Sequence, residues 1–96
     1  MPRLRWSRAA RLDVIRLYEF LAPKGRDAAA RAVQAIHDGV RTLGRHPAIG
    51  RPADEMPPEF REWLIEFGHG AYVVPYHFDG KEAVILAVRH GREAGY

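Results

Sequence analysis

The sequence contains no cysteine and only two lysines among its 96 residues. Without cysteine it can form neither disulfide bonds nor thiolate metal sites, so a domain of this size depends on its apolar core, and on any partner, for stability. No stretch approaches the roughly 18 consecutive apolar residues of a membrane span. Because the arginine-rich N-terminal stretch also lacks the apolar segment of a secretory signal, we expect a cytoplasmic protein.

A chain of this length, with 47% hydrophobic residues, fits one compact domain and has no room for a second core. Its charge is unevenly distributed, since residues 1–52 carry a formal charge of +7 and residues 53–96 carry −4. Arginine is the main basic residue, and its guanidinium group suits contacts with carboxylates and phosphates. The basic half is therefore either a solvated arginine-rich surface or a surface for an acidic partner, which could be nucleic acid or a protein segment.

The first half of the chain predicts a strand followed by two helices. Leu4 and Trp6 alternate with arginines in a strand-like pattern, and Ser7 after them is a good helix N-cap. Apolar residues then recur at three- and four-residue steps, which predicts one helix from Arg8 to before Pro23 and a second after Gly25 that stops at Gly44. We expect an antiparallel helical hairpin. Its apolar positions are Val14, Leu17, Tyr18 and Leu21 in the first helix, and Ala29, Ala32, Val33, Ile36, Val40 and Leu43 in the second.

Residues 44–59 are rich in proline and glycine and are predicted to form a loop, because proline supports neither a regular helix nor a central strand. The acidic pair Asp54-Glu55 in this loop is expected to be solvated rather than catalytic.

The second half predicts a three-stranded antiparallel meander. Alternating apolar residues indicate strands over residues 62–67 and 71–78, joined by a tight turn at residues 68–70. Pro75 predicts an edge or a bulge, because it cannot donate a ladder hydrogen bond. Asp79-Gly80 predicts a two-residue hairpin leading into a final strand over residues 83–88. That continuous apolar run suggests a strand covered on both faces, and it ends abruptly in the polar residues 89–96.

The expected fold is therefore α+β. It consists of an N-terminal strand, an antiparallel helical hairpin packed on one face of an antiparallel sheet, and a C-terminal three-stranded meander.

With this arrangement of elements, the chain resembles, over essentially its whole length, the RelE/ParE superfamily of toxins from bacterial type II toxin–antitoxin modules, and the ParE branch in particular. The resemblance rests on the strand followed by two helices, on the Pro-x-x-Gly-Arg motif within residues 43–52, on Arg61-Glu62, on Tyr72 and Tyr76, and on residues 84–92, where an apolar strand runs into Arg-His. It implies a small cytoplasmic toxin that is neutralised by an antitoxin, whose extended or helical C-terminal segment wraps the toxin. Members of the RelE branch cleave mRNA on the ribosome, whereas members of the ParE branch are described as poisoning DNA gyrase without hydrolysing nucleic acid.

Cleavage of RNA by 2′-hydroxyl attack needs a base, an acid and positive charge at the phosphate. Arg61, Arg89 and Arg92 are candidates for the positive charge, and His90 is the side chain best suited to proton transfer. By similarity to the RelE branch, Tyr96 matches a C-terminal tyrosine of the cleavage site. The sequence departs from that branch because it lacks a lysine cluster and has His90 where a catalytic arginine is usual. Arg89 and Arg92 could instead hold an antitoxin carboxylate.

We therefore predict a non-enzymatic, ParE-like toxin that binds DNA gyrase. A RelE-like endoribonuclease acting on the ribosome and its mRNA is the alternative, and a non-toxic interaction module of the same fold is a third possibility. The expected partner is a cognate antitoxin, with operator DNA reached only indirectly through it and no membrane contact. No cofactor is expected, and the histidines lack a metal-ligand spacing. The candidate partner-binding residues are Arg11, Arg16, Arg61, Arg89 and Arg92.

Overall fold

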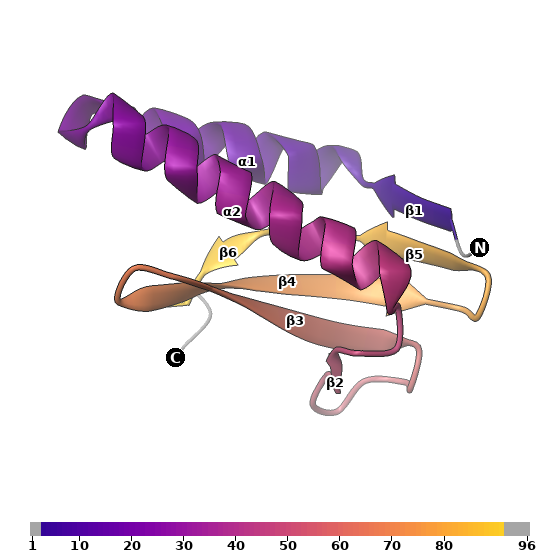
Figure 1. The fold of residues 1–96 in the computed structure, drawn as a ribbon. Helices are drawn as coiled ribbons and strands as arrows, with labels where there is room; N and C mark the ends of the chain where they lie inside the picture. The colour runs from indigo at the N-terminus through magenta and orange to yellow at the C-terminus, as the bar shows by residue number, and fades with distance from the viewer. Residues whose placement is uncertain (1–2, 92–96) are drawn as a thin grey trace.

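A computed structural model describes residues 3–91 of the chain, in which two long helices lie on one side of a twisted sheet (Figure 1). The predicted order of a strand, a helical hairpin and a three-stranded meander is confirmed. The elements are β1 (Arg3–Trp6), α1 (Arg8–Leu21), the 3-10 turn η1 (Ala22–Lys24), α2 (Arg26–Arg45), β2 (Arg51–Pro52), β3 (Phe60–Phe67), β4 (Gly70–Phe78), β5 (Glu82–Ile85) and β6 (Arg89–His90).

The strands form one sheet in the order β1-β5-β4-β3-β2, and β6 also pairs with β4. The strands β3, β4 and β5 are the predicted antiparallel meander. In contrast, β1 pairs with β5 in parallel, with Arg3 opposite Glu82 and Trp6 opposite Ile85. The sheet is therefore mixed, and the long connection that a parallel pair requires contains the helical hairpin.

Helix α1 begins where the sequence predicts, because the Ser7 hydroxyl accepts a hydrogen bond from the Ala10 N–H at 3.0 Å. Val14 and Leu17 face the sheet and are buried. Tyr18, which we expected on the same apolar face, is instead 39% exposed. Tyr18 lies at the edge of the buried face, because it is about 40° around the helix from Val14 on the side away from Leu17.

Helix α2 continues through Gly44 and ends at Arg45, so the prediction that Gly44 stops the helix is wrong. Gly44 has a packing role instead, because a Cβ atom at this position would lie 3.1 Å from Cδ2 of Leu4 in β1. The helix ends just before Pro47, which disfavours helical backbone at the preceding residue His46.

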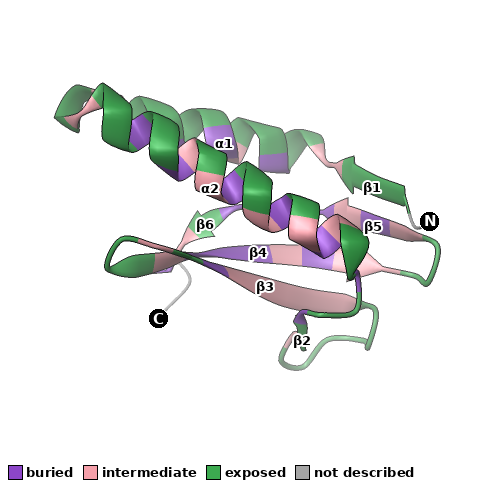
Figure 2. Cartoon of the chain, in the orientation of Figure 1, coloured by how far each residue is buried: buried purple, intermediate pink, exposed green. Residues whose placement is uncertain are grey.

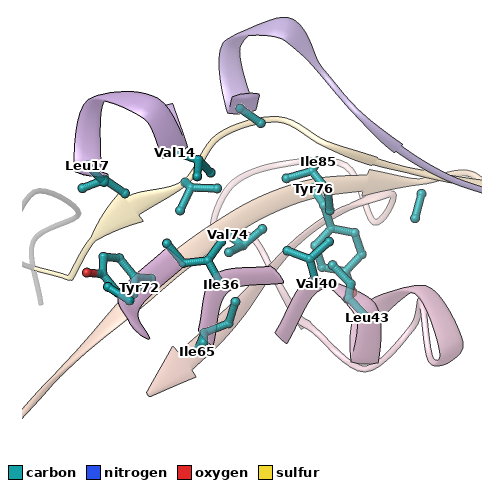
Figure 3. Close-up of a cluster of buried hydrophobic side chains, with 14 residues drawn as sticks. Val14, Leu17, Ile36, Val40, Leu43, Ile65, Tyr72, Val74, Tyr76 and Ile85 are labelled. Carbon is teal, nitrogen blue, oxygen red and sulfur yellow. The ribbon is translucent and has the colours of Figure 1, made fainter. Parts of the chain in front are cut away.

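The main core lies between the helical hairpin and one face of the sheet (Figures 2 and 3). Among residues 3–91, helices cover only this face, so the prediction that the final strand is covered on both faces is wrong. Ala83 and Ile85 are buried, whereas Val84 and Leu86 are only partly buried. The labelled core side chains in Figure 3 are Val14, Leu17, Ile36, Val40, Leu43, Ile65, Tyr72, Val74, Tyr76 and Ile85.

Two connections differ from the sequence-based prediction. The loop after α2 contains the short strand β2, which pairs with β3 at the sheet edge, where a proline is tolerated. The turn after β4 occupies residues 79–81, one residue more than the predicted Asp79-Gly80 pair. Within it, the Asp79 carboxylate accepts hydrogen bonds from the N–H groups of Lys81 and Glu82, both at 2.8 Å. These bonds lower the pKa of Asp79. Asp54 and Glu55 are exposed, as predicted.

Candidate functional site

The final strand is interrupted opposite Pro75 of the central strand β4. The Leu86 N–H donates to the Pro75 carbonyl at 2.9 Å, but Arg89 then pairs with Val73, so the final strand has one residue more than β4 over this stretch. This is a β-bulge, and it lies where Pro75 has no N–H to donate. Of the two predictions for Pro75, the bulge is confirmed and the edge is wrong. The predicted continuous strand over residues 83–88 is also wrong, because β5 ends at Ile85.

Two polar side chains in and before α1 hold the bulge in place. Asp13 Oδ2 accepts a hydrogen bond from the Val88 N–H at 2.9 Å, and the Ser7 hydroxyl donates to the Leu86 carbonyl at 3.2 Å. A buried backbone group without a partner costs about 1–3 kcal/mol, so these contacts replace the ladder bonds that the bulge removes. Sequence reasoning missed Asp13, whose only signal was a carboxylate next to the apolar face of a helix.

Beyond the bulge, β6 displays Arg89 and His90 on opposite faces of the sheet. His90 pairs with Tyr72 on the helix-covered face, where the two rings meet edge to face with centroids 5.7 Å apart. Arg89 pairs with Val73, and the side chains of this pair point to the other face of the sheet. The Arg89 side chain is exposed. The Gly91 N–H donates to the Ala71 carbonyl at 2.7 Å, so the pairing continues to the end of the described chain.

At the opposite end of β4, Tyr76 and Arg61 clamp the loop that follows α2. The fully buried Tyr76 hydroxyl donates to the Pro47 carbonyl at 2.7 Å and accepts from the Gly50 N–H at 2.9 Å. Arg61 Nη1 donates to the carbonyls of Ala48 and Gly50, at 3.2 and 2.8 Å. Burial raises the pKa of Tyr76, and the Gly50 hydrogen bond and the Arg61 charge partly offset that rise.

Gly50 is required in this clamp, because a Cβ atom here would lie 2.6 Å from the Tyr76 ring and 2.7 Å from the Glu62 carbonyl oxygen. The Pro-x-x-Gly-Arg motif of the sequence therefore has a structural explanation. Its Pro47 carbonyl and its Gly50 N–H both bond the same tyrosine, and its Arg51 pairs with Glu62 at 3.2 Å.

The strand register separates the candidate catalytic side chains. Arg61 is paired with Tyr76 and His90 with Tyr72, so they lie about 13 Å apart along β4. Arg89 lies on the opposite face of the sheet from both. Arg92 and Tyr96 lie outside the described residues. Within the described part of the chain, the candidate set does not converge on one point.

The face of the sheet that the helices do not cover carries a shallow groove beside the bulge. The groove has a volume of about 340 Å³ and runs past Phe60, Pro75 and Leu86 to Met56 in the loop before β3. Met56 is 49% exposed. The lining is completed by Ala53, Asp54, Arg61, Glu62 and Tyr76, so apolar and charged residues are mixed along the groove, as they are on surfaces that bind proteins.

The outer face of α1 forms a second candidate surface. Leu12 and Ile15 are 52% and 54% exposed and lie beside the exposed Arg11 and Arg16. Arg16 Nη2 is 3.9 Å from Asp13 Oδ1. This mixture of apolar and basic side chains is typical of a surface that contacts an acidic partner.

Among residues 3–91, no cluster of histidine and carboxylate side chains could hold a metal ion. Within the same range, no helix is long and apolar enough to cross a membrane.

Comparisons with known proteins agree with this fold. A family model described as the ParE toxin of the type II toxin–antitoxin system parDE matches residues 4–95. The curated Toxin RelE3 of Caulobacter vibrioides is 31% identical over 84 residues, covering 88% of each chain. Toxin RelE1 of the same organism is 32% identical, covering 88% of this chain and 87% of its own.

Two solved structures share the fold. A chain of the chromosomal ParDE toxin–antitoxin system from P. aeruginosa superposes with a TM-score of 0.77 at 29% identity, covering 94% of this chain and 96% of that one. A chain of the RelBE2 toxin–antitoxin complex from Mycobacterium tuberculosis superposes with a TM-score of 0.65 at 23% identity, covering 94% and 99%. The protein described here thus belongs to the ParE toxin family of type II toxin–antitoxin systems, within the RelE/ParE superfamily.

Proposed function

We propose that this toxin arrests growth in the cytoplasm by binding DNA gyrase, without catalysing a reaction, until its cognate antitoxin neutralises it. The observation that carries the proposal is the register of β4, with Arg89 on one face and His90 and Arg61 on the other. Phosphodiester cleavage needs a base, an acid and positive charge close to one phosphate. A surface that binds a protein has no such requirement.

Two surfaces serve this function in our proposal. Arg89 and the groove at Phe60, Pro75 and Leu86 contact the gyrase target, since they lie on the uncovered face of the sheet. The outer face of α1, with Arg11 and Arg16, contacts the antitoxin. Arg61 has a smaller part, because its guanidinium group already bonds the loop carbonyls. In this scheme operator DNA is reached only through the antitoxin.

The direct test is a DNA supercoiling assay with purified gyrase. Wild-type toxin is expected to inhibit supercoiling, and Arg89→Ala is expected to weaken that inhibition about tenfold or more, as loss of a central interface arginine does. Arg31→Ala, which also removes an exposed arginine but on α2, serves as the matched control and should inhibit like the wild type. Supercoiling that is unaffected by wild-type toxin would rule out the gyrase target.

The alternative is a RelE-like, ribosome-dependent endoribonuclease. Two observations favour it: both curated relatives carry the name RelE, and β6 places a histidine next to an arginine. Primer extension on translated mRNA after induction distinguishes the two proposals. New 5′ ends that disappear in His90→Ala would establish cleavage, and their absence would remove this alternative.

Growth itself tests whether the chain is toxic at all. Induction should arrest growth, and co-expression of the protein encoded by the neighbouring gene should restore it. If induction leaves growth unchanged, the chain is a non-toxic interaction module of the same fold.

A further inference from the structure

The bulge in the final strand decides which face of the sheet carries Arg89. Before the bulge, Ile85 pairs with Tyr76. After it, Arg89 pairs with Val73, whose side chain points to the uncovered face. If the strand continued from Ile85 without the extra residue, Arg89 would lie opposite Tyr72, on the face that the helices cover. The one extra residue therefore places Arg89 on the uncovered face.

The bulge leaves two backbone groups of the final strand without a ladder partner in β4. Pro75 has no N–H, so the Leu86 carbonyl accepts a hydrogen bond from the Ser7 hydroxyl instead. The N–H of Val88 donates to Asp13 Oδ2. Val88 is fully buried in the main core, where an N–H without a partner is costly. The bulged register therefore depends on the acceptor that Asp13 supplies.

Helix α1 holds the Asp13 carboxylate between the bulge and the surface of the molecule. The side chain of Asp13 is 25% exposed, and its Oδ1 lies 3.9 Å from Arg16 Nη2. Ser7 fixes the start of the same helix, because its hydroxyl accepts from the Ala10 N–H while it donates to the bulge. Asp13 is therefore held on a rigid element, which a residue that positions another one requires.

We propose that Asp13 is a positioning residue for the target-binding surface, because its carboxylate holds the one-residue bulge that places Arg89 on the uncovered face. The inference rests on the proposed function, in which Arg89 contacts the gyrase target. It adds a residue of α1, outside that surface, on which target binding depends. Asp13 acts through the bulge and not by contact with the target.

Two substitutions separate the hydrogen-bond acceptor from the negative charge. Asp13→Asn removes the charge but keeps a side-chain oxygen that can accept from the Val88 N–H. Asp13→Leu has a branched side chain in the same place and no acceptor, and Asp13→Ala replaces it if the leucine variant does not fold. Glu19→Leu removes an exposed carboxylate from the same helix and is the matched control.

The register is measured by NMR on the full chain. The wild type should show nuclear Overhauser contacts between the rings of Tyr72 and His90, whose centroids are 5.7 Å apart. Its Gly91 amide, which donates to the Ala71 carbonyl at 2.7 Å, should exchange slowly. In Asp13→Leu the ring contacts should disappear, and the Gly91 amide should exchange at least about tenfold faster relative to the amides of β3.

Asp13→Asn and Glu19→Leu should keep both signals. An Asp13→Leu protein with the wild-type register would overturn the proposal, whether or not the toxin acts on gyrase. Loss of the register in Asp13→Asn as well would assign the effect to the charge and would overturn the role of the hydrogen bond.

A general loss of stability is distinguished by Val40→Ala, which opens a cavity in the core beneath α2. This variant should speed the exchange of β3 and Gly91 amides alike and keep the contact between Tyr72 and His90. Loss of that contact in Val40→Ala would show that any destabilisation releases β6, and the proposal would fail.

Inhibition of gyrase supercoiling is the second readout, at matched concentrations of folded protein. Asp13→Leu should inhibit about tenfold or more weakly than the wild type, and Asp13→Asn should stay within about threefold. Because Asp13 acts through Arg89, the double variant Asp13→Leu/Arg89→Ala should be no weaker than Arg89→Ala alone. Additive losses would overturn the proposal. If the wild type does not inhibit gyrase, the gyrase proposal fails, and the NMR measurement still decides the role of Asp13.

Discussion

The two ends of β4 carry the same residue type on the same face, but the fold uses them differently. Tyr76 and Tyr72 are both buried, and burial raises the pKa of both hydroxyls. The Tyr76 hydroxyl bonds Pro47 and Gly50 within the protein. Tyr72 instead contacts the rings of Phe67 and His90, and within residues 3–91 its hydroxyl makes no hydrogen bond. At one end of β4, Tyr76 holds a loop through hydrogen bonds within the protein. At the other end, Tyr72 packs against His90 of β6, the strand that also carries the exposed Arg89.

The comparison shows why chemical type alone does not identify a site residue. Arg61 and Arg89 look equivalent in the sequence. In the fold, Arg61 bonds two loop carbonyls at the Tyr76 end, whereas Arg89 is exposed at the Tyr72 end.

The largest difference between the two ends should appear at their glycines. Gly50→Ala is expected to destabilise the protein by about 2–4 kcal/mol, because its Cβ would overlap the Tyr76 ring and the Glu62 backbone. Gly70→Ala is the matched control, since its Cβ would approach His90 Nε2 at only 3.4 Å, and it should cost less than about 1 kcal/mol. Urea denaturation measures both, and equal losses would contradict the distinction between the two ends.

The tyrosine hydroxyls should differ next. Tyr76→Phe leaves the Gly50 N–H and the Pro47 carbonyl without their partner and should cost about 1–3 kcal/mol of unfolding free energy. Tyr72→Phe should change the unfolding free energy by less than about 0.5 kcal/mol. A Tyr76→Phe protein as stable as the wild type would show that the clamp contributes nothing, and denaturant titration of the two variants decides this.

Substitution of the two arginines should change the unfolding free energy less than Gly50→Ala and Tyr76→Phe do. The two variants should also separate a loss of stability from a loss of toxicity. Arg61→Ala should lower the unfolding free energy by about 1 kcal/mol, because two hydrogen bonds to loop carbonyls are lost. Arg89→Ala should leave the unfolding free energy within about 0.5 kcal/mol of the wild type and reduce growth arrest. Thermal denaturation and growth curves of the two variants measure these effects. The opposite pattern would assign Arg61 to the target surface.

The smallest expected effect is the response to alkaline pH. Both buried tyrosines have a folded-state pKa above the ordinary value of 10.0, so their contribution to stability is full below that pH. It is lost as the pH rises through the folded-state pKa, because the unfolded chain releases the proton more readily. Tyr72→Phe removes one of these groups, so between about pH 9 and about pH 11 this variant should lose less stability than the wild type. Urea denaturation across that range is the check.

Much of the fold follows from local patterns in the sequence. Ser7 caps α1 as expected, and the alternation of Trp63, Ile65 and Phe67 marks the strand face that packs against the helices. The errors arose where distant residues decide the outcome. Gly44 reads as a helix stop, but it is retained inside α2 because Leu4 packs against it.

The position of the bulge also could not be predicted from the local sequence. The apolar run over residues 83–88 predicts one strand, and only the pairing with Pro75 reveals where it breaks. The candidate site was predicted as a list of residue types. The candidate side chains lie on two faces of the sheet because of the register of β6 against β4. The periodicity within a single strand does not determine that register.

The parallel pairing of β1 with β5 has a consequence for the timing of activity. It joins residues 3–6 to residues 82–85, so this edge of the sheet closes only after residues 82–85 have been synthesised. Contacts between such distant segments form late, because the intervening chain must first be ordered. A nascent chain that has not reached residue 82 can form the helical hairpin but cannot complete this edge of the sheet. The complete toxin sheet therefore appears only after both helices and the strands β3 and β4 have been made.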